Sequence, residues 1–313
     1  MSIRGKRAII TGSARGIGLS VARALAAAGA SVVVNSRDAT AVAGAVQEIK
    51  DAGGTALAAA GPVDDPAFVT EIVERCVKAF GGVDILINNA AVFDGGTIGP
   101  ILGCSIDSWR KTMAVNLDGV FFGCRAVLPH MIAQRWGRII NTASFAGTGK
   151  MGGSAYSTSK SALFGLTRAI AADYGPYGIT ANAFNPEALT AMGAANDVEA
   201  YRAFLHHVEK RGFRSAAETA YSYDTSGPDA IAPWVTYLCT DEAEYLNGQA
   251  FAVESRRIGL IAAPEEERVL FRDHAGHGVW KLEELSRMAP LVFRVSNRWP
   301  RRTEEDLRIW EQV

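Results

Sequence analysis

A tyrosine and a lysine four residues apart form a pair that can transfer a proton. Tyr156 and Lys160 lie in a segment with helical periodicity, so their side chains share one face of the helix. A phenol titrates at about pH 10, and a nearby ammonium group favours the phenolate and lowers that pKa. Ser144 lies in a loop after a predicted strand, where its hydroxyl can hydrogen-bond a substrate oxygen. These three residues therefore predict acid–base chemistry at a substrate oxygen.

A glycine-rich segment near the N-terminus has the composition of a phosphate-binding loop. Residues 11–18 read Thr-Gly-Ser-Ala-Arg-Gly-Ile-Gly, directly after an apolar run and before an alanine-rich segment with helical periodicity. Glycine lets the backbone turn tightly and approach a pyrophosphate, and the helix N-terminus presents free N–H groups. The segment predicts a dinucleotide site formed by Gly12, Ser13, Arg15, Gly16, Ile17 and Gly18.

The end of the second predicted strand favours NADP(H) over NAD(H). A carboxylate about 20 residues after the glycines would hold a ribose 2′-hydroxyl, but Ser36 and Arg37 occupy that place. An arginine pairs with a 2′-phosphate, which a carboxylate would repel. Arg15 can add a second positive charge from the glycine-rich segment. The alternative that Arg37 is an ordinary surface arginine at a strand end stays open.

Strands and helices alternate along the chain and position these residues. Short apolar runs predict strands at 7–11, 31–35, 56–60, 84–88, 137–141, 179–185 and 249–254, the last of which is expected to finish the sheet. Segments with helical periodicity predict helices at 19–28, 39–52, 66–80, 105–135, 156–174 and 229–240. This alternation predicts an α/β fold with a doubly wound parallel sheet and helices on both faces.

The pattern also predicts how the chain is divided. Residues 1–260 are expected to form one dinucleotide-binding and catalytic domain, with a substrate lid at about 191–227 where the alternation stops. A plain pair of surface helices is the alternative for that stretch. Residues 261–313 contain too few apolar periods for a second domain. We expect this C-terminal extension to pack on the core or on a neighbouring subunit, because its apolar residues would otherwise be exposed.

The composition excludes several classes of protein. The chain has 313 residues, 32 basic against 33 acidic side chains and 48% hydrophobic residues. This balance argues against a nucleic-acid binder and against wholesale disorder. No apolar stretch is long enough for a membrane span, and residues 1–7 run straight into a strand, which leaves no room for a signal peptide. The four cysteines are widely spaced and no cluster of metal ligands stands out, so we expect a cytoplasmic protein without a metal site.

The order and spacing of these residues, together with Asn89, Ala90 and Asn116, resemble the short-chain dehydrogenase/reductase family over about residues 3–260. The resemblance implies a Rossmann-type fold and hydride transfer at a carbonyl or alcohol carbon, usually in a homodimer or homotetramer. It implies that Tyr156 is the acid–base group and that Ser144 positions the carbonyl.

Further roles follow from the same resemblance. Lys160 is implied to lower the tyrosine pKa and to hold the nicotinamide ribose, and Asn116 to support a water molecule in the proton relay. Contacts along the cofactor are implied for Asn89, Ala90, Val63, Leu189 and Thr190. The chain departs from the family pattern at Pro62, Ala91, Glu187 and Ser255-Arg256.

A narrower resemblance concerns the substrate. Residues 233–259 resemble the (3R)-hydroxyacyl-CoA dehydrogenase part of peroxisomal multifunctional enzyme type 2 and its single-domain bacterial relatives. We therefore expect an NADP(H)-dependent enzyme that acts on a small hydrophobic alcohol or ketone: a 3-hydroxyacyl thioester, a steroid or a cyclic ketone. A 3-oxoacyl-ACP reductase, and an idle family member serving as a binding or regulatory subunit, are the alternatives.

Overall fold

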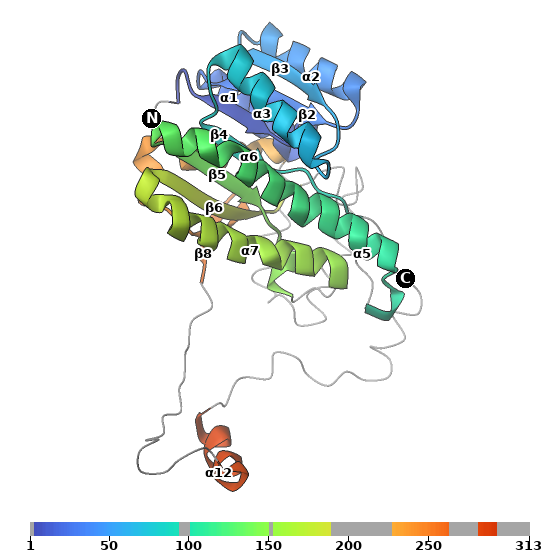
Figure 1. Cartoon of the computed structure of the whole chain (residues 1–313), viewed down its shortest axis with the longest axis vertical. Coiled ribbons are helices and arrows are strands. Elements are labelled where there is room, and N and C mark those ends of the chain that lie inside the picture. The colour runs from blue at the N-terminus through green and yellow to red at the C-terminus, as the bar shows by residue number, and fades with distance from the viewer. Residues whose placement is uncertain (1–2, 94–100, 150–152, 189–226, 263–280, 293–313) are drawn as a thin grey trace. The chain divides into compact units, whose positions relative to one another are not determined.

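The computed structural model describes residues 3–93, 101–149, 153–188, 227–262 and 281–292 (Figure 1). The chain divides into a first unit, Met1–Ile261, and a second unit, Ala262–Val313. In the second unit the structure describes one helix, α12 (Leu282–Val292). The expected packing of this extension on the core or on another subunit therefore stays a prediction.

The first unit is built on an eight-stranded sheet in the order β3-β2-β1-β4-β5-β6-β7-β8. The strands are β1 (Arg7–Ile10), β2 (Ser31–Ser36), β3 (Thr55–Ala60), β4 (Ile85–Asn88), β5 (Gly137–Thr142), β6 (Ile179–Pro186), β7 (Ala250–Glu254) and β8 (Arg257–Ile261). All neighbouring pairs from β3 to β7 are parallel. The predicted Rossmann-type fold is confirmed, and the seven predicted strands match within one residue at each end.

Helices cover both faces of the sheet (Figure 1). The α-helices of this unit are α1 (Gly16–Ala27), α2 (Ala39–Asp51), α3 (Pro66–Phe80), α5 (Ile106–Met113), α6 (Gly119–Gln134), α7 (Ser154–Tyr174) and α10 (Ala232–Leu238). Short 3-10 turns lie at Ile101–Gly103, Phe145–Thr148, Gly175–Tyr177, Pro228–Ala230 and Asp241–Ala243. One apolar core packs α1, α2 and α10 on the sheet, and a second packs α3, α6 and α7 on the opposite face.

The structure differs from the predicted helix at 105–135. A π-helical turn, Ala114–Asp118, separates α5 from α6, with Asn116 at its centre. A π turn accommodates an extra residue, so it changes the direction of the side chains that follow without ending the helix, and such turns are frequent at functional sites. The predicted helix at 229–240 is likewise shorter, because a 3-10 turn precedes α10.

The expectation that residues 249–254 finish the sheet is wrong. Ser255 and Arg256 form a two-residue turn that returns the chain as β8, which pairs antiparallel with β7. Ile258 and Leu260 of this edge strand are 51% and 65% exposed. The departure from the family pattern at Ser255-Arg256 therefore coincides with an added strand.

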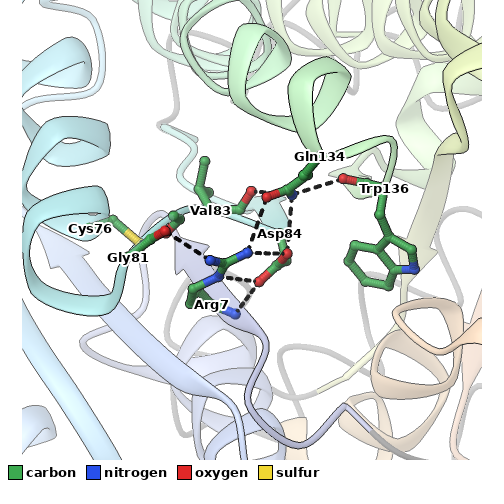
Figure 2. A network of polar contacts seen from close by, with 8 residues as sticks. Arg7, Cys76, Gly81, Val83, Asp84, Gln134 and Trp136 are labelled. Carbon is green, nitrogen blue, oxygen red and sulfur yellow. Dashed lines mark hydrogen bonds and ion pairs between the residues drawn. The ribbon is translucent and has the colours of Figure 1, made fainter.

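A charged network joins the strands at the edge of the sheet where they begin (Figure 2). Arg7 donates from Nε and Nη2 to the two carboxylate oxygens of Asp84, at 2.5 and 2.6 Å. Gln134 accepts from Arg7 and donates to the carbonyl oxygens of Val83 and Trp136. The hydrogen bond with Asp84 raises the pKa of Arg7. The network thus ties the starts of β1, β4 and β5 together.

Removing the carboxylate of this network should destabilise the fold. Asp84→Ala leaves a partly buried guanidinium without its partner, so we expect a loss at the lower end of about 3–5 kcal/mol in the free energy of unfolding. Urea unfolding measures the change. The control is Glu71→Ala, which breaks an exposed 3.6 Å ion pair with Arg75 and should cost at most about 1 kcal/mol. Equal losses in the two variants would contradict this account of the network.

Candidate active site

The predicted site residues gather at the edge of the sheet where the parallel strands end. β1 lies between β2 and β4, so the chain crosses over in opposite directions on the two sides of β1. In open α/β sheets a ligand-binding crevice forms at such a switch point, outside the carboxyl ends of the strands. The loop after β1 holds the glycine-rich segment, and the loops after β4 and β5 hold Asn89 and Ser144.

The glycine loop (residues 11–18) packs too closely for side chains at two of its positions. A Cβ atom on Gly18 would lie 2.4 Å from the carbonyl oxygen of Gly12 and 2.6 Å from Nδ2 of Asn89. Gly12 has a φ of 63°, and a Cβ atom there would lie 2.7 Å from Cα of Ala90. The N-cap residue of α1, Arg15, makes no side-chain capping hydrogen bond. The N–H groups at this helix end therefore suit a phosphate.

Ser13 does not face a ligand with its side chain. It is fully buried, its hydroxyl donates to the carbonyl oxygen of Ile10 at 2.6 Å, and it accepts from the backbone N–H of Asn35 at 3.0 Å. The side chain therefore joins the loop to β2. Its backbone N–H also donates to the carbonyl oxygen of Asn35, at 2.7 Å, so the cofactor contact of Ser13 stays a prediction.

The residues predicted to select the cofactor lie around the end of β2. Ser36 is half-buried, whereas Arg37 and Arg15 are exposed. Val63 is buried, and its carbonyl oxygen lies 3.0 Å from where a Cβ atom on Gly119 would be. The guanidinium groups are thus accessible to a solvent-facing phosphate, whereas the cofactor contact of the buried Val63 stays a prediction.

Asn89 and Ala90 are joined to the glycine loop by a buried threonine. Oγ1 of Thr11 accepts from the backbone N–H groups of Asn89 at 2.9 Å and Ala90 at 3.1 Å. The Asn89 side chain in turn donates to the carbonyl oxygens of Thr11 and Gly12. Hydrogen bonds therefore hold the loops after β1 and β4 against each other.

The acid–base residues come together from α7 and the loop after β5. Tyr156 and Lys160 lie in the first two turns of α7, and Tyr156 is hydrogen-bonded to the Ser144 side chain. Lys160 is buried, and its Nζ donates to the carbonyl oxygen of Thr142 at 2.7 Å, 5.8 Å from the centroid of the Tyr156 ring. The hydroxyl groups of Ser144 and Tyr156 and the buried amine of Lys160 therefore lie near one another at the ends of the strands.

The pKa values differ from the expectation that Lys160 lowers the pKa of Tyr156. Burial raises the pKa of Tyr156, and the hydrogen bond with Ser144 only partly offsets it. Burial also lowers the pKa of Lys160 to about 7, so a large share of this amine is neutral at neutral pH. Burial therefore sets the direction of the tyrosine shift, and the lowering of that pKa by Lys160 stays a prediction.

Asn116, in the π-helical turn, joins the loop after β4 to helix α7. Its Oδ1 accepts from the backbone N–H of Val92 at 2.8 Å, and its Nδ2 donates to the Val92 carbonyl oxygen at 3.1 Å and to Oγ of Ser159 at 3.3 Å. The Ser159 hydroxyl donates to the carbonyl oxygen of Tyr156. The water relay that the resemblance implies for Asn116 stays a prediction.

Two residues of the site were not predicted. The ring of Phe93 packs edge-on against Tyr156, with centroids 4.7 Å apart and an interplanar angle of 71°. Ser159, described above, links Asn116 to α7. Neither belongs to a pattern of charged or glycine residues, so composition and spacing gave no signal for them. Leu189, Thr190 and nearly all of the predicted lid lie outside the described residues.

The structure also bears on membrane spans and metal sites, over the part of the chain that it describes. No helix there is long and apolar enough to cross a membrane. Among the same residues, no group of three or more histidine, cysteine or acidic side chains could hold a metal ion.

Comparison with known proteins gives consistent matches. The sequence model of the family described as short chain dehydrogenase matches residues 6–201. A hydroxy(phenyl)methylsuccinyl-CoA dehydrogenase subunit of Thauera aromatica is 34% identical, over 81% of this chain and 96% of its own length. A cyclohexanol dehydrogenase of an Acinetobacter species is 33% identical, over 80% and 93%. The crystal structure of a short chain dehydrogenase from Burkholderia cenocepacia in complex with NADP has a TM-score of 0.69 and 32% identity, covering 82% of this chain and 98% of that one.

The lowered pKa of Lys160 should appear in the pH dependence of stability. In the unfolded chain the amine keeps a pKa near its ordinary 10.5, so between about pH 7 and that value the unfolded state binds more protons. Wild-type stability therefore gains up to about 1.4 kcal/mol per pH unit from this group as pH rises through that window. Lys160→Met should lose this gain, so its stability relative to wild type is greatest below pH 7 and falls towards pH 10. Urea unfolding at several pH values measures the difference.

The exposed Lys50, in the last turn of α2, provides the control as Lys50→Met. Its stability difference from wild type should not vary with pH in this window. A difference for Lys160→Met that is equally flat would contradict a buried amine with a pKa of about 7.

Proposed function

Because the chain belongs to the short chain dehydrogenase family, we propose that it is an NADP(H)-dependent oxidoreductase that interconverts a hydrophobic secondary alcohol and its ketone. The observation that carries this proposal is the meeting of Ser144, Tyr156 and Lys160 at the strand ends that also hold the glycine loop. Membership of the family establishes an oxidoreductase; the roles of these residues and the substrate class are the proposal.

The glycine loop fits a dinucleotide. The absence of side chains at Gly12 and Gly18 lets the loop pack against Asn89 and Ala90, and the N-terminus of α1 presents free N–H groups to the phosphates. Arg15 and Arg37 face solvent at the same end of β1 and β2, where a 2′-phosphate can pair with them. The relative from Burkholderia cenocepacia binds NADP, which supports the same cofactor here.

Proton transfer is assigned to the tyrosine. When bound, the reduced nicotinamide supplies a hydride to the carbonyl carbon. The phenol of Tyr156 donates its proton to the carbonyl oxygen, while Ser144 donates a hydrogen bond to that oxygen and holds it in place. In the oxidative direction Tyr156 takes the proton back. Lys160, whose buried Nζ lies 5.8 Å from the centroid of the Tyr156 ring, is assigned to hold the nicotinamide ribose.

The surroundings of Tyr156 favour an apolar substrate. The Phe93 ring lies against the phenol and presents an apolar surface to whatever binds there. Two relatives support this class, since one is named for a CoA thioester that bears a phenyl-substituted alcohol and one for cyclohexanol. The narrower resemblance to the peroxisomal multifunctional enzyme stays a prediction. So does the cytoplasmic location.

The alternatives differ from the proposal in what they require. An idle family member needs no working acid–base group. This chain keeps all four residues of the proposed catalytic set, and the structure places them at the strand ends: Asn116, Ser144, Tyr156 and Lys160. A 3-oxoacyl-ACP reductase would need a surface that receives an acyl-carrier protein. An assay of acyl-ACP beside acyl-CoA, steroid and cyclic ketones separates these functions.

We also propose that the protein forms a homodimer or homotetramer. Ile106, Trp109 and Phe121 of α5 and α6 are 64%, 37% and 48% exposed, which is unusual for large apolar side chains unless they are covered by a partner. A second copy of the chain is the partner that the family predicts. Light scattering after size-exclusion chromatography measures the state, and a monomer would contradict it.

Replacing the tyrosine tests its role directly. Tyr156→Phe should lower kcat by at least about 10²–10⁴ because the proton donor is lost, whereas the cofactor Kd should stay nearly unchanged. Tyr174→Phe, in the last turn of the same helix, is the control and should keep full activity. A Tyr156→Phe enzyme that retains more than about a tenth of wild-type kcat would show that another group moves the proton.

The cofactor preference should reverse when the end of β2 is changed. One charge-assisted hydrogen bond to the 2′-phosphate is worth about 1.5–3 kcal/mol, and solvent exposure of Arg37 moves the effect to the lower end, about tenfold in favour of NADP(H). The double variant Ser36→Asp with Arg37→Leu adds an acceptor for the ribose hydroxyl and removes the arginine. We would measure kcat/KM with both cofactors, and a wild type that prefers NAD(H) would overturn the assignment.

A further inference from the structure

Asn185 is a buried amide without a hydrogen-bond partner. The residue is 4% exposed, and neither its Oδ1 nor its Nδ2 has a partner. A buried amide in this condition costs free energy, so such groups are rare in native proteins. Asn182 on the same strand shows the ordinary arrangement, since it donates to the Leu246 carbonyl oxygen and accepts from the Gln249 N–H. On β6, the amide of Asn182 is therefore hydrogen-bonded through both its nitrogen and its oxygen, whereas the amide of Asn185 is unpaired.

The unpaired amide lies at the functional end of the sheet. Asn185 is the next-to-last residue of β6, and the residue before it, Phe184, accepts from the N–H of Ala143, next to Ser144. Side chains alternate between the faces of a strand. Ala181 and Ala183 pack in the core beneath α7, whereas Phe184 packs in the opposite core. Asn185 therefore belongs to the face covered by α7, the helix that carries Tyr156 and Lys160.

We propose that Asn185 binds the nicotinamide half of the cofactor. This inference rests on the proposed function and adds a residue to it. The amide offers a donor and an acceptor side by side, which complements a carboxamide or a ribose hydroxyl. Hydride transfer requires that half of the cofactor to lie within reach of Tyr156, whereas the adenine half is placed by the glycine loop and Arg37.

The variant Asn185→Leu separates this role from a structural one. Leucine has the same branching and the same number of non-hydrogen atoms but no polar atoms, so the unliganded protein should melt at the same temperature or higher. The Kd for NADP⁺, measured by calorimetry, should weaken about tenfold with the loss of one to two hydrogen bonds. Adenosine 2′,5′-bisphosphate, which lacks the nicotinamide half, should bind the variant and the wild type equally.

Thr180→Val is the matched control. Thr180 lies near the start of β6, is also 4% exposed and also has an unpartnered hydroxyl. This variant should change neither Kd. If Asn185→Leu does not fold, Asn185→Ala removes the same amide and is judged by the same two Kd values.

Two results would overturn the inference. An unchanged Kd for NADP⁺ would show that the amide does not contact the cofactor. An equal weakening for both ligands would show a general disturbance of the strand ends. A wild-type protein that binds neither ligand would instead contradict the proposed function.

Discussion

The loops at the carboxyl ends of the strands are held against one another by buried polar side chains, and the site depends on this. Thr11 joins the loop after β4 to the glycine loop. Asn88 donates to Asn141 on the neighbouring strand, and Asn141 donates to Thr167 of α7, both at 2.9 Å. Each buried amide is costly unless it is paired, so these partners fix the distances between the cofactor loop, Ser144 and Tyr156.

The two edges of the sheet serve different purposes. At the edge where the strands begin, Arg7 and Asp84 pair through two hydrogen bonds, so these two charged groups satisfy each other (Figure 2). At the other edge the structure keeps groups that are not optimal for stability: a helix end without a side-chain cap, a buried amine with a pKa of about 7 and the unpaired Asn185. Such exceptions to local rules are expected at functional sites.

Sequence reasoning predicted the fold well because the alternation of apolar strands and amphipathic helices is a strong signal, as in the exact match of α3 (Pro66–Phe80). It missed β8, because Ser255-Arg256 lacks the glycine or asparagine that marks most two-residue hairpin turns. It also missed the π-helical turn around Asn116, which leaves no mark in composition. The position of the site at the strand ends follows from the topology of the sheet. The ring contact between Phe93 and Tyr156 and the unpaired amide of Asn185 depend instead on side-chain packing, which the spacing of residues in the sequence does not encode.

The central claim is that the protein transfers a hydride between a nicotinamide and a carbonyl carbon. The most direct measurement supplies NADPH that carries deuterium at both C4 positions to the protein, together with acyl-CoA, steroid and cyclic ketones, and analyses the products by mass spectrometry. The account predicts a secondary alcohol with one deuterium on the carbinol carbon. An alcohol whose carbinol hydrogen comes from solvent, or no reduction of any ketone in the panel, would contradict it.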